Sequence, residues 1–325
     1  MNHLQRYLVD EFIEDYQEGQ LSRRKALKLI AGITGATLAT QLLAACGQPA
    51  EQPTGAAPTI AAAPTTEAPT TEAPTTAAAA PAAGAATASN SVPVDDPAIV
   101  AAPVQFPSGD ATLMGYLARP AGEGRFPIVL VCHENRGLTP HIEDVARRAA
   151  KAGYVGLAID LLSREGGVAN VSDPDSIPGL LSGAPPERHV QDFRSGLEYL
   201  KAQPFAQADR AGMVGFCFGG GVTWLVAAGI PELRAAVPFY GPPVPIEQVP
   251  NINAAVLAVL AERDQRINGQ VPPVAEALQA AGKTYKQVIY PGVDHAFHND
   301  TGQRYNAEQA LAAWNETLAW FKQYL

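Results

Sequence analysis

The sequence predicts an α/β fold in which a mostly parallel sheet carries helices on both faces. Short apolar runs of strand length alternate with longer amphipathic runs of helical period through residues 96–325. Such alternation is typical of parallel strands joined by helical crossovers. A region of this length can also bury one sizeable core. We therefore expect residues 96–325 to form one α/β domain.

The expected elements follow one another in regular order. Strands are predicted at residues 126–132, 155–159, 211–215, 235–240, 254–260 and 285–290, and helices at 141–152, 186–202, 222–228, 271–281 and 308–324. Residues 104–117 are expected to add a starting hairpin. The glycine- and proline-rich residues 164–184 are expected to form either a structured pocket mouth or a mobile loop.

The most informative motif is Gly215-Phe216-Cys217-Phe218-Gly219, which follows a predicted strand and precedes a predicted helix. This is the form of a nucleophile elbow with cysteine in the position usually held by serine. The helix that follows would direct its N-terminal amides toward the sulfur, which predicts a lowered thiol pKa and a thiolate. The alternative is a buried cysteine among glycines at a tight strand-to-helix contact.

An acid and a histidine follow the elbow in the order that α/β-hydrolases use. Asp264 comes after the apolar run 254–260, and His295 comes after the predicted strand 285–290. Each residue alone could be an ordinary loop side chain. The three together, each after a strand, predict a triad of Cys217, Asp264 and His295.

A fourth element lies after the predicted strand 126–132, where the chain reads Cys132-His133-Glu134-Asn135-Arg136-Gly137. Folds with a nucleophile elbow take a second oxyanion donor from this loop. Its partner is the N–H of the residue after the nucleophile, here Phe218.

From about Val104 to its end, the chain resembles the dienelactone hydrolase family, the carboxymethylenebutenolidases, which have the α/β-hydrolase fold. The resemblance is carried by the runs 133–138, 144–148, 152–154, 215–220 and 295–297. It implies that Cys217 is the nucleophile, His295 the base and acid, and Asp264 its orienter. It further implies that Glu134 binds the resting thiol and that the backbone N–H groups of Phe218 and Asn135 hold the oxyanion.

The resemblance implies hydrolysis of a small lactone or carboxylic ester through a thioester, without a cofactor. Members of the family grip a substrate carboxylate with arginines, one of them four residues after the catalytic histidine, and that position is Asn299 here. Arg136 and Arg164 remain as candidate substrate contacts, with Arg188 as a third; the alternative for each is a solvated surface arginine. No histidine or cysteine spacing matches a zinc site.

Two other functions share the same motifs. One is an exported carboxylesterase or thioesterase with an unrelated substrate. The other is a lipid-anchored binding protein that has lost its chemistry. A nucleic-acid partner is disfavoured, because the formal net charge is −9 and the basic residues do not cluster.

The first 46 residues predict a signal peptide. Residues 22–28 carry the twin-arginine pair Arg23 and Arg24, the moderately apolar run 29–45 follows, and residues 43–47 resemble a lipoprotein box. We expect export by the twin-arginine machinery, lipidation at Cys46 and a membrane anchor on the extracytoplasmic face. A single-span transmembrane anchor is the alternative.

The next segment, residues 47–95, consists mainly of alanine, proline, threonine, glycine and glutamate, which predicts a disordered tether. With Cys46 lipidated, Cys132 and Cys217 are the remaining thiols of the three cysteines. Cys132 is expected either to fill apolar space or to form a reversible disulfide with Cys217.

Overall fold

The structure is a computed structural model that describes residues 1–45 and 90–325. An eight-stranded sheet forms its centre, in the order β1-β2-β4-β3-β5-β6-β7-β8. The strands are β1 (Ile99–Ser108), β2 (Ala111–Pro120), β3 (Phe126–Cys132), β4 (Val155–Asp160), β5 (Ala206–Phe216), β6 (Ala235–Phe239), β7 (Ala255–Ala261) and β8 (Tyr285–Tyr290). The first two form an antiparallel hairpin at one edge, and the six strands β3 to β8 run parallel to one another.

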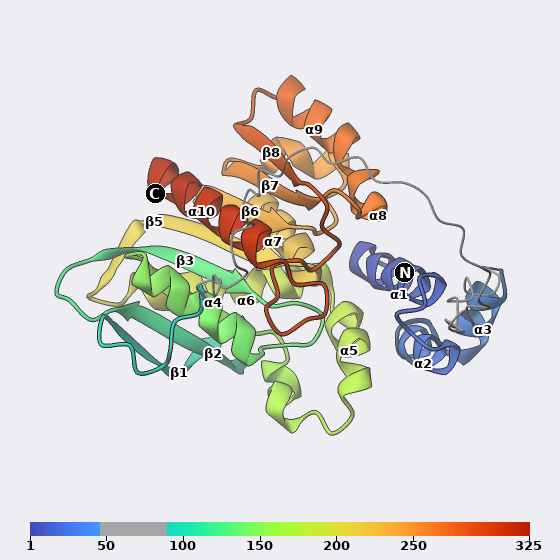
Figure 1. The fold of residues 1–325 in the computed structure, drawn as a ribbon. Coiled ribbons are helices and arrows are strands. Elements are labelled where there is room, and N and C mark those ends of the chain that lie inside the picture. Colours follow the sequence, from blue (N-terminus) through green and yellow to red (C-terminus); the bar gives the residue numbers. More distant parts are fainter. Residues whose placement is uncertain (46–89) are drawn as a thin grey trace, which may run out of the picture.

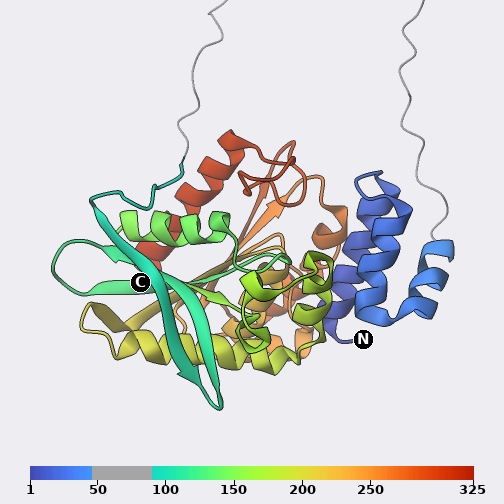
Figure 2. The ribbon, with the colours of Figure 1, turned by 90° about the horizontal axis from the view of Figure 1, so that it is seen from below.

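Helices cover both faces of this sheet, as Figures 1 and 2 show. On one face lie α4 (Pro140–Lys151) and α10 (Ala307–Tyr324), and on the other lie α6 (Pro186–Lys201) and α7 (Phe218–Gly229). The short α8 (Gln265–Asn268) and α9 (Val271–Ala280) connect β7 to β8. The predicted fold class, a mostly parallel sheet of the α/β-hydrolase type, is confirmed.

Strand and helix positions agree closely with the sequence pattern, with two informative differences. Helix α7 begins at Phe218, four residues earlier than expected, because the chain turns directly from the elbow into the helix. Residues 164–184, expected as either a structured pocket mouth or a mobile loop, contain α5 (Ile177–Gly183). Pro178 and Gly179 masked this helix in the sequence, although proline is tolerated in a first turn.

The N-terminal residues form three helices, α1 (His3–Gln17), α2 (Arg23–Thr34) and α3 (Ala36–Ala45). Figures 1 and 2 show them together at one side of the molecule, where α1 packs on α5 and α7 and α2 packs on α5. Their buried side chains include Leu4, Leu8, Phe12, Leu29 and Ile30. The segment read in the sequence as a leader thus buries an apolar face against the catalytic domain.

Local sequence explains how these helices start. Asn2 and Gln5 form a reciprocal capping box at the start of α1, and the Ser22 side chain accepts the Lys25 N–H at the start of α2. Across residues 1–45 and 90–325, no helix combines the length and apolar character needed to cross a membrane. Cys46 and residues 47–89 of the expected tether lie outside the described residues, whereas Val92 already contacts α4, its N–H donating to Asp144.

Candidate active site

The elbow holds Cys217 in a backbone conformation that side chains rarely adopt. Cys217 lies between β5 and α7 with φ 57° and ψ −119°, so the thiol stands at the tip of a sharp turn. The flanking glycines are required by close backbone contacts. A Cβ on Gly215 would lie 2.2 Å from the carbonyl of Gly219, and one on Gly219 would lie 2.4 Å from the carbonyl of His133.

Asp264 and His295 meet beside this turn, although 31 residues separate them in the chain. The Nδ1 atom of His295 lies 2.6 Å from Oδ2 of Asp264, and both side chains are buried. Asp264 is fixed because its other carboxylate oxygen accepts the Ile267 N–H at the start of α8. With Nδ1–H donated to Asp264, the Nε2 atom of His295 is left as the acceptor that faces the thiol.

Burial by itself disfavours the charged form of Asp264. The adjacent His295 and Arg266 outweigh it and hold the pKa of Asp264 below its ordinary value. The acid is therefore ionised at neutral pH and can stabilise a positively charged His295.

The thiol of Cys217 is protonated at rest, contrary to the expected thiolate. Burial, and then the nearby carboxylates of Glu11 and Glu134, raise the pKa of the thiol well above its ordinary value. Hydrogen bonds from the Tyr7 hydroxyl and the Phe218 N–H oppose this rise without cancelling it. The N–H at the start of α7 lowers the pKa of the thiol as expected, but the desolvation cost of a buried anion is larger, so the net shift is upward.

Two residues of α1 contact the sulfur directly. The Tyr7 hydroxyl lies 3.2 Å from Sγ of Cys217 and 3.4 Å from Nε2 of His295, and the Glu11 carboxylate oxygens lie 3.6 and 3.8 Å from Sγ. The sequence analysis missed both residues because it assigned this segment to a leader. The repeating buried positions of α1, from Leu4 to Phe12, are the signal that could have identified an amphipathic packed helix.

The loop after β3 supplies a mixture of structural and pocket residues. His133 is fully buried, its Nδ1–H donating to the Glu134 carbonyl and its Nε2 accepting the Leu161 N–H. This arrangement fixes the loop and leaves His133 without a free ring nitrogen. Glu134 also lies in the site, where its carboxylate accepts a hydrogen bond from the Asn299 amide.

The side chain of Asn135 turns toward α1. Its amide nitrogen donates to Oε1 of Glu11 at 2.9 Å, which ties the loop after β3 to the N-terminal helix. Among the described residues, the thiol therefore bonds to the side chains of Tyr7 and Glu11, whereas Glu134 is engaged with Asn299.

A cavity of about 270 Å³ opens above the thiol. Its lining combines the candidate nucleophile and histidine with polar side chains from α1, the loop after β3 and the segment after β8: Glu11, Asp15, Glu134, Arg136, Cys217, His295, Asn299 and Arg304. Arg304, which the sequence analysis did not single out, forms an ion pair with Asp15 at 3.2 Å. Arg136 lines the same cavity and is solvent-exposed.

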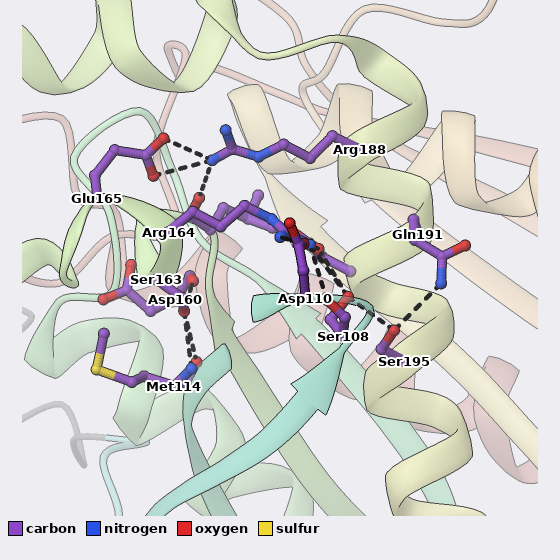
Figure 3. Close-up of polar contacts among 12 residues, drawn as sticks. Ser108, Asp110, Met114, Asp160, Ser163, Arg164, Glu165, Arg188, Gln191 and Ser195 are labelled. Atoms are coloured by element: carbon purple, nitrogen blue, oxygen red, sulfur yellow. Dashed lines mark hydrogen bonds and ion pairs between the residues drawn. The ribbon is translucent and has the colours of Figure 1, made fainter. Parts of the chain in front are cut away.

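Arg164 and Arg188 lie in a different network, shown in Figure 3. Arg164 donates to the buried Asp192 at 2.9 Å and contacts the exposed Asp110, while Arg188 pairs with Glu165 at 2.9 Å. Neither arginine lines the cavity above Cys217. The structure thus brings Arg136 to the candidate site and gives Arg164 a bridging role between the β1–β2 hairpin and α6.

Both described cysteines are free thiols. Cys132 is completely buried at the end of β3, next to Gly215 in the neighbouring strand, and burial raises its pKa well above the ordinary value. Glu11, Cys217 and His295 are also of metal-ligand type and lie within 4.8 Å of one another. Cys217 already bonds to Tyr7, and His295 already bonds to Asp264. We therefore interpret this cluster as a site for thiol chemistry and not as a metal site.

Comparison with known proteins shows which family this sequence resembles. The sequence model of the dienelactone hydrolase family matches residues 113–325. A protein of Methylorubrum extorquens, named provisionally as a carboxymethylenebutenolidase, is 35% identical over 249 residues, covering 73% of this chain and 86% of its own. A Bradyrhizobium protein, named as a probable 2-oxo-3-(5-oxofuran-2-ylidene)propanoate lactonase, is 33% identical over 224 residues, covering 65% of this chain and 90% of its own.

A solved structure gives the same relationship in three dimensions. The crystal structure of a Klebsiella pneumoniae protein, described provisionally as a dienelactone hydrolase, is similar with a TM-score of 0.65 and 35% identity. The similarity covers 70% of this chain and all of that chain. Helices α1 to α3 lie outside the residues that the family's sequence model matches.

Proposed function

The chain belongs to the dienelactone hydrolase family, and on that premise we propose that it hydrolyses a lactone or carboxylic ester with Cys217 as nucleophile. The observation that carries this proposal is the His295–Asp264 pair, which faces a thiol held at a strained strand-to-helix turn. The family resemblance supports the reaction class, and the geometry supports the assignment of the side chains.

The reaction would proceed in two halves. His295 Nε2 accepts the thiol proton as the sulfur attacks the carbonyl carbon, and Asp264 stabilises the resulting imidazolium. The backbone N–H groups of Phe218 and Asn135 hold the oxyanion. His295 then returns the proton to the leaving oxygen, which forms a thioester. A water molecule, deprotonated by His295, hydrolyses the thioester and restores the thiol.

A thiol with a raised pKa fits reactive substrates better than amides. The oxygen of an activated lactone or enol ester leaves readily from the tetrahedral intermediate. Attack by the small thiolate fraction therefore leads on to the thioester. An amide nitrogen leaves more reluctantly than a thiolate, so the tetrahedral intermediate would return to the thiol.

Two arginines of the cavity could hold a substrate carboxylate, beside the acidic side chains of Glu11, Asp15 and Glu134. Arg136 and Arg304 line the space above Cys217 and can each donate to an anion. The Bradyrhizobium relative is named for a lactone that is also a propanoate, which is consistent with a carboxylated substrate. We propose a small carboxylated lactone as the substrate class.

The decisive experiment compares the parent with Cys217→Ala on a panel of dienelactones, aryl esters and acyl thioesters. We expect the parent to prefer lactones and the variant to lose at least about a thousandfold in kcat/KM, because the covalent route is removed. Equal rates for both proteins would refute a cysteine mechanism. A parent that acts only on aryl esters or thioesters would identify the alternative exported esterase or thioesterase.

For localisation we propose twin-arginine export with lipidation at Cys46. The support is the motif itself, together with the exposure of Arg23 and Arg24 at the start of α2, where a receptor could reach them. Replacing both arginines by lysine should retain the protein in the cytoplasm, as followed by cell fractionation. Unchanged fractionation would exclude this route.

A further inference from the structure

We infer that the N-terminal helix α1 completes the active site of the full-length chain, with Glu11 and Tyr7 as positioning residues that set the protonation of Cys217. This inference rests on the proposed cysteine mechanism and adds two side chains to it. Both lie outside the residues matched by the family's sequence model, so they are a feature of this chain's N-terminal segment.

The contacts give the two residues opposite effects. The thiol donates toward Glu11, whose carboxylate oxygens lie 3.6 and 3.8 Å from Sγ, and this favours the neutral thiol beside an anion. The Tyr7 hydroxyl donates to the same sulfur at 3.2 Å, and this favours the thiolate. One residue therefore resists ionisation of the thiol and the other assists it.

Glu11 is held as an anion by its surroundings. Burial works against its charge, yet His295, Arg266, a hydrogen bond from Tyr7 and then Arg304 outweigh burial and lower the pKa of Glu11. Its Oε1 also accepts the Asn135 amide at 2.9 Å. A fixed, ionised carboxylate at this position accounts for part of the raised pKa of Cys217.

Other charged groups around the thiol come from several elements of the fold. The loop after β3 contributes Glu134, and the segment after β8 contributes His295 and Arg304. Arg266 approaches from α8 and Asp264 from the end of β7. The effect of Glu11 or Tyr7 on the thiol is therefore measured by comparing each variant with the parent.

Side chains of the catalytic domain hold α1 in place by ion pairs, a ring contact and close packing. Arg266 lies over the Tyr7 ring with its guanidinium carbon 4.7 Å from the ring centre, and it pairs with Glu14 at 2.8 Å. Arg304 pairs with Asp15. Leu4 approaches Gly221 of α7 so closely that a Cβ there would lie 3.1 Å from the leucine side chain.

Further along the segment, Lys25 and Lys28 of α2 pair with Asp175, at the turn before α5. The catalytic domain thus presents matching charges along both α1 and α2. This pattern supports a defined seat for α1 beside the thiol.

The test measures the pH profile of iodoacetamide alkylation at Cys217 in full-length parent, Glu11→Gln and Tyr7→Phe, read by mass spectrometry of the Cys217 peptide. Intact mass first establishes that residues 1–45 are present. Glu11→Gln should move the profile to lower pH, making alkylation about tenfold faster on the rising limb. Tyr7→Phe should move it to higher pH and slow alkylation by a similar factor.

Asp10→Asn is the matched control, because it removes one charge from the same helix without lining the cavity. Its profile should coincide with that of the parent. Buried Cys132 serves as an internal reference that alkylates slowly in every variant.

Superimposed profiles for the parent and both variants would overturn the inference. Shifts in the same direction would also overturn it, because they would reflect a loosened helix and not two opposed contacts. Alkylation needs no substrate, so its outcome is independent of hydrolysis. If the profiles shift as expected but the parent hydrolyses no lactone or ester, the proposed function fails and the role of α1 stands.

Discussion

Single residues decide both the chemistry and the substrate preference of this site. Cys217 is strained in its backbone and protonated at rest, so its reactivity depends on neighbours as much as on its own position. The sequence pointed to Cys217, Asp264 and His295 because each follows a recognisable strand and the three come in the order that α/β-hydrolases use. It could not identify Tyr7 and Glu11, because only the tertiary structure brings them to a sulfur more than two hundred residues away.

Arg304 is the residue whose replacement tests the proposed carboxylated substrate. Arg304→Gln should raise KM for a carboxylated lactone about tenfold and leave the KM of a neutral ester nearly unchanged, because one charge-assisted contact is lost. Steady-state kinetics on the two substrates measures the split. Arg263→Gln, which removes an exposed arginine paired with Asp294 at 3.5 Å, is the control. Equal changes for both substrates would mean that Arg304 acts through Asp15 on the fold.

At the scale of elements, strands were the easiest to predict and the short helix α5 the hardest. Buried strands such as β3 and β7 are continuous apolar runs, so their limits follow from composition. Helix α5 contains a proline and two glycines in seven residues, and its formation depends on burying Ile177 and Leu181 against its neighbours. Tertiary packing outweighed local propensity there.

The contact between α5 and α6 gives a prediction about acid stability. His189 of α6 is buried, bonds through Nε2 to the Leu181 carbonyl at 3.0 Å, and stands edge-on to Phe218. Burial lowers the pKa of His189 to about 3. Since the unfolded chain binds this proton near pH 6.5, stability is fully present above that pH and is lost as the pH falls toward 3.

We therefore expect His189→Phe to reduce the pH dependence of the unfolding free energy by about 1 kcal/mol per pH unit between pH 6 and 5. Urea denaturation at several pH values measures this slope. The variant can be less stable overall, since only the slope reports the proton. An unchanged slope would show that His189 is already charged in the folded protein.

At the scale of the whole molecule, two proposals meet in residues 1–45, an export signal and a helix that completes the site. The sequence assigns these residues to export, and the structure seats them against the catalytic domain with Tyr7 and Glu11 on the thiol. These roles are compatible for a precursor that is exported already folded, because the covered thiol stays protonated in transit. Processing at Cys46 would then remove one wall of the cavity and free the thiol from Glu11.

A pair of glycines on α5 allows this coupling to be tested without touching the site. A Cβ on Gly179 would lie 2.6 Å from the backbone oxygen of Gly32, so Gly179→Ala must push α2 away from α5. A Cβ on Gly183 would meet nothing within 4 Å, so Gly183→Ala gains the same helix propensity without a clash. Comparison of the two variants therefore separates the effect of displacing the N-terminal helices from the effect of a more stable α5.

In the full-length chain, Gly179→Ala should make residues 1–45 several times more susceptible to limited proteolysis and should change the alkylation profile of Cys217. Gly183→Ala should match the parent in both. The expected link is mechanical, because α1 and α2 share the α5 surface and displacement of one loosens the other. If proteolysis rises while Cys217 keeps its parental profile, α1 holds its seat independently of α2. The thiol would then be governed by the contacts of Arg266 and Arg304 with α1 alone.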